Sequence, residues 1–571
     1  MKERLYRDLL PKVAKPARYS GGEFNMIRKD WQTSLAKMVL AFPDVYEVGM
    51  SHVGSKILYG LVNEKSSHLL ERAYAPWPDM EKVMRSGGIP LYTLESFRPL
   101  SDFDIIGFSL QYELSITNVL NMLALSGIPL RSRERDDKHP LIIAGGPVAF
   151  NPEPFADFFD LFIIGDGEEV LLELLDKTYE LRGRSKKEKL LNLSVLEGVY
   201  APALYKAVYE ENGSFASLLP QYPEARPRVR KRVVRDLDRA YFPECPIVPH
   251  LSIIHDRAVL EVMRGCQRGC RFCQAGMVYR PVRERSRDLL LDQAKKQLKS
   301  TGYEEISLAS LSTLDYSGVL PLVKELISQY QDKGVGVALP SLRVDAFSVE
   351  LANEVQKVRK TTLTLAPEAA TQRLRDVINK NVSEEELFQA VEAAFKSGWL
   401  ALKLYFMLGL PGETDEDLLA VHELLTRVRS IGNHHAQRGA GHHPQVGVVL
   451  RGQHDGGNLG LVAHLGQEER HQRGAEHAPA GLAIGIAFVE LVGDQHPHRH
   501  GDERGAQNPA QHLRADEGRD PGSHRASQSM VDQRGHQNAQ NNRPGFAETG
   551  CQYQCEQLGF IAHLGQGDDG G

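Results

Sequence analysis

The chain has 571 residues and a formal net charge of −6, with 42% hydrophobic and 25% charged residues. This length predicts two to four domains, and the composition excludes a disordered or fibrous protein. The small negative charge excludes a general attraction to nucleic acid or to anionic membranes. The N-terminus has no apolar signal core, and the apolar run 481–489 is too short to span a bilayer, so we expect a cytoplasmic protein.

The first 35 residues, which mix charges and prolines, are predicted to form a surface arm. From residue 36 to 180, continuous apolar runs alternate with helical patterns, which is typical of a parallel sheet covered on both faces. We therefore expect a Rossmann-like α/β domain over these residues. Its predicted strands are 38–42, 105–110, 141–144 and 161–164, and its predicted helices include 51–63 and 115–126.

Glycine-rich turns follow two of these predicted strands, at Gly145-Gly146-Pro147 and at Gly165-Asp166-Gly167. In open parallel sheets, ligands bind outside the carboxyl ends of the strands. Glycine at such a position lets the backbone approach a ligand closely. The sequence therefore predicts a ligand-binding edge in this domain.

Residues 181–250 contain two basic stretches, 182–187 and 226–232, and prolines are interleaved with the second. This pattern indicates a connector between two domains. A nucleic-acid patch is the sharper interpretation, but few aromatic side chains are present for base stacking, which favours a solvated face. Nucleic acid as a partner stays open, and no membrane partner is expected.

Residues 251–432 repeat the alternation of strand and helix with short connections, which predicts a partial TIM-like (β/α) barrel. Sites in such barrels lie at the carboxyl ends of the strands. The predicted strands are 259–263, 305–309, 336–339, 362–365 and 402–407, and the predicted helices are 288–300, 318–331, 348–358 and 383–396.

Three cysteines, Cys266, Cys270 and Cys273, stand as C-x3-C-x2-C directly after the first of these strands. Such a cluster, in a long chain with few other cysteines, indicates metal binding in a reducing compartment. Three thiolates can hold a [4Fe–4S] cluster with one iron left open. A structural zinc site is the alternative, but the carboxyl end of a barrel strand favours the iron–sulfur interpretation. The fourth zinc ligand would be Cys245, His250 or His255.

The spacing C-x3-C-x-aromatic-C, with Phe272 as the aromatic residue, resembles the radical S-adenosylmethionine (radical SAM) superfamily. The resemblance implies that the open iron chelates the amino and carboxylate groups of S-adenosylmethionine (AdoMet). One electron, from a reductant such as ferredoxin or flavodoxin, then cleaves the sulfonium to a 5′-deoxyadenosyl radical. The cofactors carry this chemistry and the protein positions them. Phe272 would shield or stack on the ligand of the cluster.

The resemblance also implies AdoMet contacts after the later strands. Residues 310–312 stand where the family meets the AdoMet amino group, and 343–345 follow the next strand. Residues 366–371 are similar to the ribose-contacting segment, with Ala369 in place of a serine, and 409–414 resemble the G-x-P-G-E turn near the adenine. Helix caps and turns are the alternative for each position. The positions assigned to AdoMet are Phe272, Ser310, Ser312, Arg343, Glu368, Thr371, Gly409, Pro411, Gly412 and Glu413.

The turns 144–147 and 164–168 are similar to those of the cobalamin-binding domain that precedes the cluster domain in one radical SAM branch. Domains that supply an axial histidine carry D-x-H-x-x-G, whereas this chain reads Met50-Ser51-His52-Val53-Gly54-Ser55 and lacks the Asp and the final Gly. We expect that any cobalamin bound here has no axial ligand from His52. Another ligand, or a scaffold role, stays open for this domain.

After Gly432 the sequence changes character, with no lysine, few aromatic residues and 15 of the 21 histidines. Such a composition cannot bury enough apolar surface to offset chain entropy. We expect an unstructured, frame-shifted tail over 433–571 that leaves the barrel unfinished. The edge of the strand 402–407 would then be exposed.

The function predicted from these patterns is that of a radical SAM iron–sulfur enzyme. It would cleave AdoMet reductively, and cobalamin-assisted methyl transfer is the first specific reaction. The alternatives are a methylthiotransferase-like modification of RNA or protein, and a metal-binding scaffold without catalysis. The truncated barrel is expected to weaken activity, and the sequence names neither the substrate nor the catalytic side chains.

Overall fold

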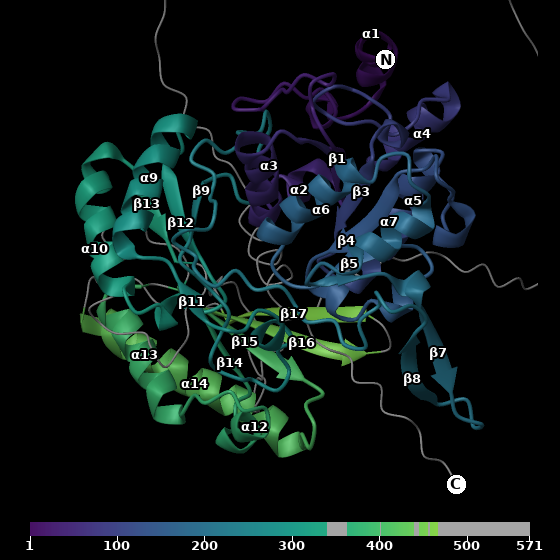
Figure 1. Cartoon of the computed structure of the whole chain (residues 1–571). Coiled ribbons are helices and arrows are strands. Elements are labelled where there is room, and N and C mark those ends of the chain that lie inside the picture. The colour runs from purple at the N-terminus through teal and green to yellow at the C-terminus, as the bar shows by residue number, and fades with distance from the viewer. Residues whose placement is uncertain (340–362, 400, 439–444, 455–456, 466–571) are drawn as a thin grey trace, which may run out of the picture.

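The computed structural model describes residues 1–339, 363–399, 401–438, 445–454 and 457–465. Figure 1 shows two α/β units side by side, the first in purple to blue and the second in teal to green. The expected α/β class is confirmed, with a parallel-sheet unit followed by a β/α unit. Among the described residues, no helix is long and apolar enough to cross a membrane.

The first unit is built on a six-stranded sheet with the order β2-β1-β3-β4-β5-β6. All neighbouring strands are parallel except the last pair, in which β6 runs antiparallel to β5. The four predicted strands are present, and β2 and β6 are additions that the apolar pattern did not predict. The strands are β1 (Lys37–Phe42), β2 (Leu69–Tyr74), β3 (Ile105–Ser109), β4 (Leu141–Gly145), β5 (Leu161–Ile163) and β6 (Val199–Tyr200).

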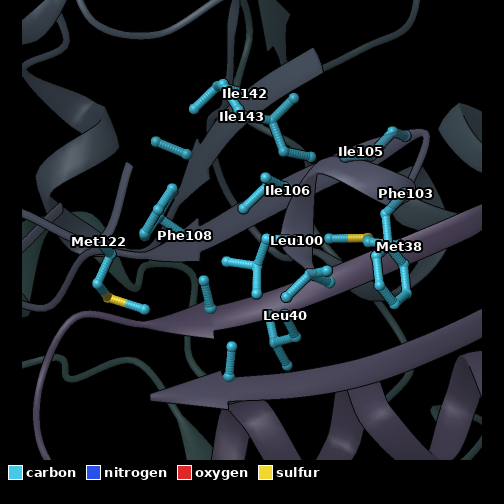
Figure 2. Close-up of a cluster of buried hydrophobic side chains, with 14 of the residues drawn as sticks. Met38, Leu40, Leu100, Phe103, Ile105, Ile106, Phe108, Met122, Ile142 and Ile143 are labelled. Carbon is cyan, nitrogen blue, oxygen red and sulfur yellow. The ribbon is translucent and has the colours of Figure 1, made fainter. Parts of the chain in front are cut away.

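Helices cover both faces of this sheet (Figure 1). On one face α3 contacts α6, and on the other Asn121 of α5 hydrogen-bonds to Arg85 (2.6 Å) and Glu81 (2.8 Å) of α4. Apolar side chains of β1, β3 and β4 fill the core between the layers, as Figure 2 shows for Met38, Ile106 and Ile142. The helices are α2 (Tyr46–Gly49), α3 (Val53–Lys65), α4 (Pro78–Gly87), α5 (Ile116–Leu125) and α6 (Glu168–Glu180).

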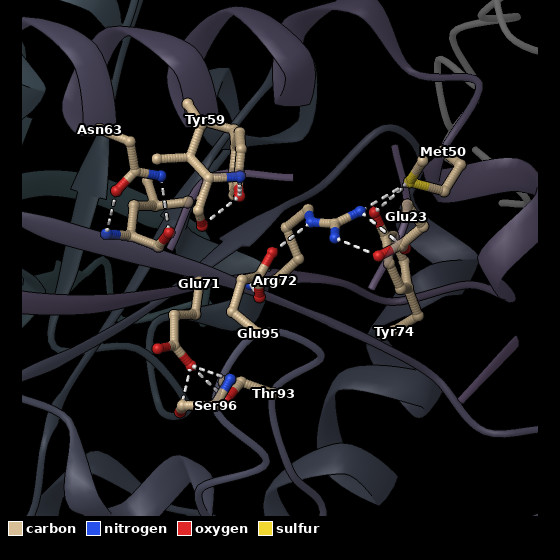
Figure 3. A network of polar contacts seen from close by, with 12 residues as sticks. Glu23, Met50, Tyr59, Asn63, Glu71, Arg72, Tyr74, Thr93, Glu95 and Ser96 are labelled. Atoms are coloured by element: carbon tan, nitrogen blue, oxygen red, sulfur yellow. Dashed lines mark hydrogen bonds and ion pairs between the residues drawn. The ribbon is translucent and has the colours of Figure 1, made fainter. Parts of the chain in front are cut away.

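Strand β2 escaped the apolar pattern because it carries two charged residues, Glu71 and Arg72, that are both buried. The Arg72 guanidinium forms ion pairs with Glu23 at 3.0 Å and Glu95 at 2.6 Å (Figure 3). Its Nη1 also donates to the sulfur of Met50 at 3.0 Å. Since Glu23 precedes the sheet, this network fastens the N-terminal segment to β2. The expected surface arm is thus packed against the core, in which its leucines Leu5, Leu9 and Leu10 are buried.

The expected connector is more structured than its basic composition suggested. Helix α7 (Lys186–Leu193) starts with a capping box between Ser185 and Glu188, and its leucines Leu190 and Leu193 are buried in the first core. The hairpin β7 (Tyr205–Tyr209) and β8 (Phe215–Pro220) then projects from the body in Figure 1. Arg232 of the second basic stretch pairs with Glu169 and Glu173 at 2.9 and 2.7 Å. At least this cation is therefore neutralised within the chain.

The second unit carries β strands at every predicted position in the described residues. One sheet has the parallel order β13-β12-β9, and a second contains β14-β15-β16-β17. The predicted helix 348–358 lies outside the described residues. The strands are β9 (Ala258–Glu261), β10 (Met263–Arg264), β11 (Arg283–Glu284), β12 (Glu305–Ala309), β13 (Gly336–Ala338), β14 (Leu363–Glu368) and β15 (Ala401–Leu408). The helices are α8 (Ala275–Val278), α9 (Arg287–Thr301), α10 (Val319–Tyr330), α12 (Gln372–Val377), α13 (Glu384–Lys396) and α14 (Asp415–Arg438).

The structure corrects one expectation about the C-terminal part. Helix α14 continues past Gly432, and β16 (Gln445–His454) pairs in parallel with β15. A further strand, β17 (Gly457–Leu465), pairs antiparallel with β16. The prediction of an exposed β15 edge is therefore wrong, because the run Val446-Gly447-Val448-Val449-Leu450 has enough β-branched residues to add a strand. The expected unstructured tail over 466–571 lies outside the described residues.

Candidate metal and cofactor site

The three cysteines lie in the loop 265–282, whose two ends are joined by the short antiparallel pair β10–β11. Gly265 and Gly269 have φ angles of 84° and 82°, which favour glycine. A Cβ at Gly265 would lie 2.7 Å from the carbonyl oxygen of Pro281, so no larger residue fits there. The expected wrapping of the loop by its glycines is present.

The three thiols are close enough to influence one another. Burial raises the pKa of the Cys273 thiol, the backbone N–H of Gly276 lowers it, and nearby Cys270 and Cys266 raise it again. All three are free thiols, and Cys270 is the most buried. Within the described part of the chain, however, no three His, Cys, Asp or Glu side chains are assembled in the geometry of a metal site.

The donor set nevertheless fits a [4Fe–4S] cluster in kind and number, since it offers three thiolates on one loop and leaves a fourth iron without a protein ligand. The zinc alternative needs a fourth ligand. Among the described residues, neither Cys245 nor either of the two histidines considered for it forms a metal-binding group with the loop. The three thiols therefore fit the cluster in kind and number, and their role as its ligands stays a prediction.

Residues distant in the sequence hold the cysteine loop from outside. Asn379 donates from its side-chain amide to the carbonyl oxygen of Gly269 at 2.8 Å, and the backbone N–H of Arg271 donates to Ile378 at 2.9 Å. Within the loop itself, Arg280 donates to the carbonyl oxygen of Cys266 at 3.3 Å. Sequence reasoning missed these contacts because each links side chains and backbone that only the tertiary fold brings together.

Lys380 is the most informative residue that sequence reasoning missed. Its side chain is buried, donates to Glu368 at 3.1 Å and lies 5.7 Å from the ring centroid of Phe272. Its positive charge also lowers the pKa of the Cys273 thiol. One sequence signal was present, because Asn379 and Asn381 on either side have positive φ angles of 53° and 50°, a conformation enriched in asparagine. Lys380 therefore joins the cysteine loop to the end of β14.

The serines predicted to contact AdoMet follow β12. Ser310 Oγ hydrogen-bonds to Thr313 Oγ1 at 3.0 Å. Ser312 is 1% exposed, and its hydroxyl has no hydrogen-bond partner. A buried unpaired hydroxyl is costly and indicates a place for a ligand or water. Arg343 lies outside the described residues.

The other predicted AdoMet positions have structural roles in the turns where they lie. Thr371 caps α12 and donates to Asp417 at 2.6 Å, and Glu413 accepts from the backbone N–H of Gly409 at 2.6 Å. The carbonyl oxygen of Gly412 accepts from Arg373 at 2.9 Å, and Pro411 is exposed. The turn is therefore closed by its own side chains, and its contact with AdoMet stays a prediction.

A cavity of about 390 Å³ lies between the two units. The first unit lines it with the carboxyl ends of its strands, including Gly107–Ser109 and Gly145, and with the turn Gly165–Glu168. The second unit adds the barrel side, including Val259 and Ser310, and the cavity reaches Gly265 and Ala275 of the cysteine loop. The cavity therefore joins the predicted ligand-binding edge of the first sheet to the ends of the cysteine loop, and Ser310 represents the predicted AdoMet positions in its lining.

His52 lines this cavity, but its ring serves as a helix cap. The backbone N–H of Ser55 donates to His52 Nδ1 at 3.1 Å, at the start of α3. Burial lowers the pKa of His52 to about 4, so the ring is neutral at physiological pH. A neutral imidazole that accepts at Nδ1 carries its hydrogen on Nε2. That nitrogen then has no lone pair for a metal, which supports the expectation that His52 is not a cobalt ligand.

Two family models match the chain. A model described as "Radical SAM proteins, N-terminal" matches residues 54–202, and one described as "Radical SAM superfamily" matches residues 260–425. The two matches fall on the first and second α/β units, respectively.

Curated relatives point the same way. The chain is 30% identical over 348 residues to an uncharacterized protein of Methanocaldococcus jannaschii, with 60% of this chain and 67% of that protein covered. It is 25% identical to an uncharacterized methyltransferase of Pyrococcus horikoshii, covering 50% of this chain and 57% of the relative. It is 24% identical to a ribosomal protein uS12 methylthiotransferase of Phocaeicola vulgatus, with 47% of this chain and 61% of that protein covered.

Solved structures with a similar arrangement include the radical S-adenosylmethionine methyltransferase TsrM from Kitasatospora setae, with cobalamin and a [4Fe–4S] cluster bound. It is 14% identical, with 73% of this chain and 75% of that chain covered and a TM-score of 0.49. The cobalamin-dependent S-adenosylmethionine radical enzyme OxsB is 15% identical to this chain. The match covers 68% of this chain and 52% of that chain, with a TM-score of 0.47. Both likenesses are too distant to assign a ligand to this chain.

Proposed function

Because this chain belongs to the radical SAM superfamily, we propose that it is an iron–sulfur enzyme that cleaves AdoMet reductively and uses cobalamin in a methyl transfer. The observation that carries this proposal is the single cavity shared by the cysteine loop and the carboxyl edge of the first sheet. A methyl carrier held at the sheet edge would there face a radical formed at the loop. One relative's description as a methyltransferase also favours this reaction.

The cluster would be held by Cys266, Cys270 and Cys273. When bound, it would supply one electron to AdoMet, received from a reductant such as ferredoxin or flavodoxin, to start radical chemistry. The protein's own contribution is electrostatic and steric. Lys380 places a buried positive charge near Cys273, which opposes the rise in the pKa of that thiol caused by burial, and Phe272 packs against the apolar cluster that contains Leu410.

AdoMet would lie between the cysteine loop and the ends of β12 and β14. The unpaired hydroxyl of Ser312 and the carboxylate of Glu368 support this placement. We expect Glu368→Ala to weaken AdoMet binding, measured by calorimetry on iron-loaded protein, while Glu385→Ala on an exposed helix start leaves it unchanged. Equal affinity in Glu368→Ala and wild type would remove this carboxylate from the site.

A methylthiotransferase-like modification of RNA or protein is the second candidate, because one relative is described as a ribosomal protein uS12 methylthiotransferase. The two reactions differ in what they add. Product formation that requires added cobalamin and introduces only carbon would favour methyl transfer, whereas new sulfur in the product would favour the second candidate. The substrate itself stays unnamed, because substrate specificity depends on side chains that the fold does not dictate.

The first experiment is anaerobic purification followed by metal analysis. We expect brown protein with iron and sulfide, and colourless protein when Cys266, Cys270 and Cys273 are all replaced by alanine. Cys245→Ala is the matched control, since this cysteine is exposed and lies outside the loop. Formation of 5′-deoxyadenosine with a reductant would separate an enzyme from a metal-binding scaffold, and stoichiometric zinc without iron would overturn the proposal. The thiol cluster also suits a reducing, cytoplasmic location.

A further inference from the structure

The neck of the cysteine loop is held by charges that come from the other unit. Strands β10 and β11 form this neck and pair Arg264 with Arg283 across it. Two like charges directly opposite each other would destabilise such a pair. A compensating negative charge is therefore needed at this place, and neither β10 nor β11 supplies it at these two positions.

Asp166 supplies that charge from the turn after β5. One oxygen of its carboxylate lies 3.4 Å from Arg264 Nη1, and the other lies 2.5 Å from Arg283 Nη1. The second oxygen also accepts the backbone N–H of Val234 at 2.8 Å. The side chain of Asp166 is only 13% exposed. A single carboxylate of the first unit thus bridges both strands that carry the cysteine loop.

Glu168 and Glu261 complete the arrangement around Arg264. Arg264 Nη2 lies 2.5 Å from Glu168 at the start of α6, and Arg264 Nε lies 2.8 Å from Glu261 of β9. Glu261 also pairs with Arg285 at 3.1 Å. The cluster therefore contains as many carboxylates as guanidinium groups. Loss of one partner would leave an uncompensated buried charge, which costs more than loss of an exposed pair.

The same turn also borders the cavity, because Gly165–Glu168 and Arg264 are among its lining residues. We propose that Asp166 and Glu168 are positioning residues that fix the cysteine loop from the first unit, so that the cavity and the loop are mechanically coupled. The inference rests on the proposed function only for the identity of the metal centre. We call the ion pairs of Asp166 and Glu168 with Arg264 and Arg283 the ionic clamp. The clamp involves no metal and can be measured without one.

The test is the reactivity of the loop thiols in the metal-free, full-length protein. Iodoacetamide alkylation of Cys266, Cys270 and Cys273 is followed by peptide mass spectrometry. We expect these rates to rise about tenfold in Asp166→Asn and by a smaller factor in Glu168→Gln, because the loop opens more often once its neck is released. Glu169→Gln is the matched control, since Glu169 is the next residue on α6 and pairs with Arg232 instead.

Cys245 provides an internal standard, because it is exposed and lies outside the loop. An increase confined to the loop thiols, measured under conditions in which each variant is fully folded, supports the clamp. Loop rates equal to those of Glu169→Gln overturn it. If Asp166→Asn does not fold, Glu168→Gln decides alone, because Arg264 keeps Asp166 and Glu261 in that variant.

Iron release gives a second readout that does not depend on turnover. Iron-loaded Glu168→Gln should lose iron to a chelator several-fold faster than Glu169→Gln, and equal rates of loss count against the clamp. The two proposals fail separately. Wild-type protein that binds no iron, yet shows the predicted thiol rates, would refute the proposed function and keep the clamp.

Discussion

Two arginines with little solvent exposure, the buried Arg72 and the partly buried Arg264, show how the same chemistry serves two purposes in this molecule. Arg72 lies within the first unit between Glu23 and Glu95, and Figure 3 shows its ion pairs with these two carboxylates. Arg264 lies between the two units, and two of its three carboxylate partners come from the other unit. The first arginine joins a segment to its own sheet, whereas the second joins the border of the cavity between the units to the cysteine loop.

The protonation of the carboxylates also differs between the two places. Burial raises the pKa of Glu95 to about 7, although Arg72 opposes this effect. At the other site, Arg264 and Arg285 outweigh burial and lower the pKa of Glu261. Glu95 therefore titrates near neutral pH, whereas Arg72 holds the pKa of Glu23 below its usual value and the Glu261 carboxylate beside the cavity stays charged. The following variants test this comparison.

The largest effect is expected from Arg72→Met. The change leaves two buried carboxylates without their partner and should lower the free energy of unfolding by about 3–5 kcal/mol. Urea denaturation followed by circular dichroism measures this loss. Arg85→Met is the control, because Arg85 is 50% exposed in its pair with Glu81 and should cost less than about 1 kcal/mol. Similar losses in both variants would show that the Arg72 network is not a buried ion-pair cluster.

The next effect concerns pH. Because the folded pKa of Glu95 is raised from 4.5 to about 7, its contribution to stability is present below pH 4.5 and is lost as the pH rises through about 7. We expect Glu95→Gln to remove a decline on the order of 3 kcal/mol across this window. His52, whose pKa burial lowers to about 4, acts in the opposite sense in part of the window. The difference between wild type and variant therefore isolates Glu95, and a pH-independent difference would contradict the raised pKa.

Arg264→Lys tests the second site in the same terms. Lysine keeps the charge but cannot bind several carboxylates with one planar fork, so we expect a loss of about 1–3 kcal/mol in the free energy of unfolding. The loss should be smaller than in Arg72→Met because a cation remains. Arg287→Lys, in an exposed pair with Asp288, is the matched control. A loss no larger than that of the control would show that the fork geometry of Arg264 is unimportant.

The smallest effect is expected at His52. Loss of its cap on α3 in His52→Ala should cost about 1 kcal/mol. The absorption and paramagnetic spectra of added cobalamin should not change, since the Nε2 of His52 carries a hydrogen. Disappearance of an axial nitrogen signal in the variant would show that His52 is a cobalt ligand after all.

Much of the fold could be predicted from the sequence because its signals are local. The apolar runs of β1, β3, β4 and β5 and the C-x3-C-x2-C spacing each lie within a few residues. The prediction missed β2 because Glu71 and Arg72 interrupt its apolar pattern, and their burial depends on partners elsewhere. It also misjudged the β15 edge, because a single short run, 446–450, supplied the pairing strand.

The sequence by itself determined the cysteine loop, the alternation of strands and helices and the two glycine-rich turns of the first unit. Only the tertiary structure decided that Asp166 meets Arg264 and Arg283, and that Lys380 lies beside Phe272. The physical reason is that hydrophobic periodicity and loop spacing act between neighbours in the chain, whereas an ion pair is selected by the path of the backbone through space. Residues about a hundred positions apart become partners only when the strands that carry them are packed together.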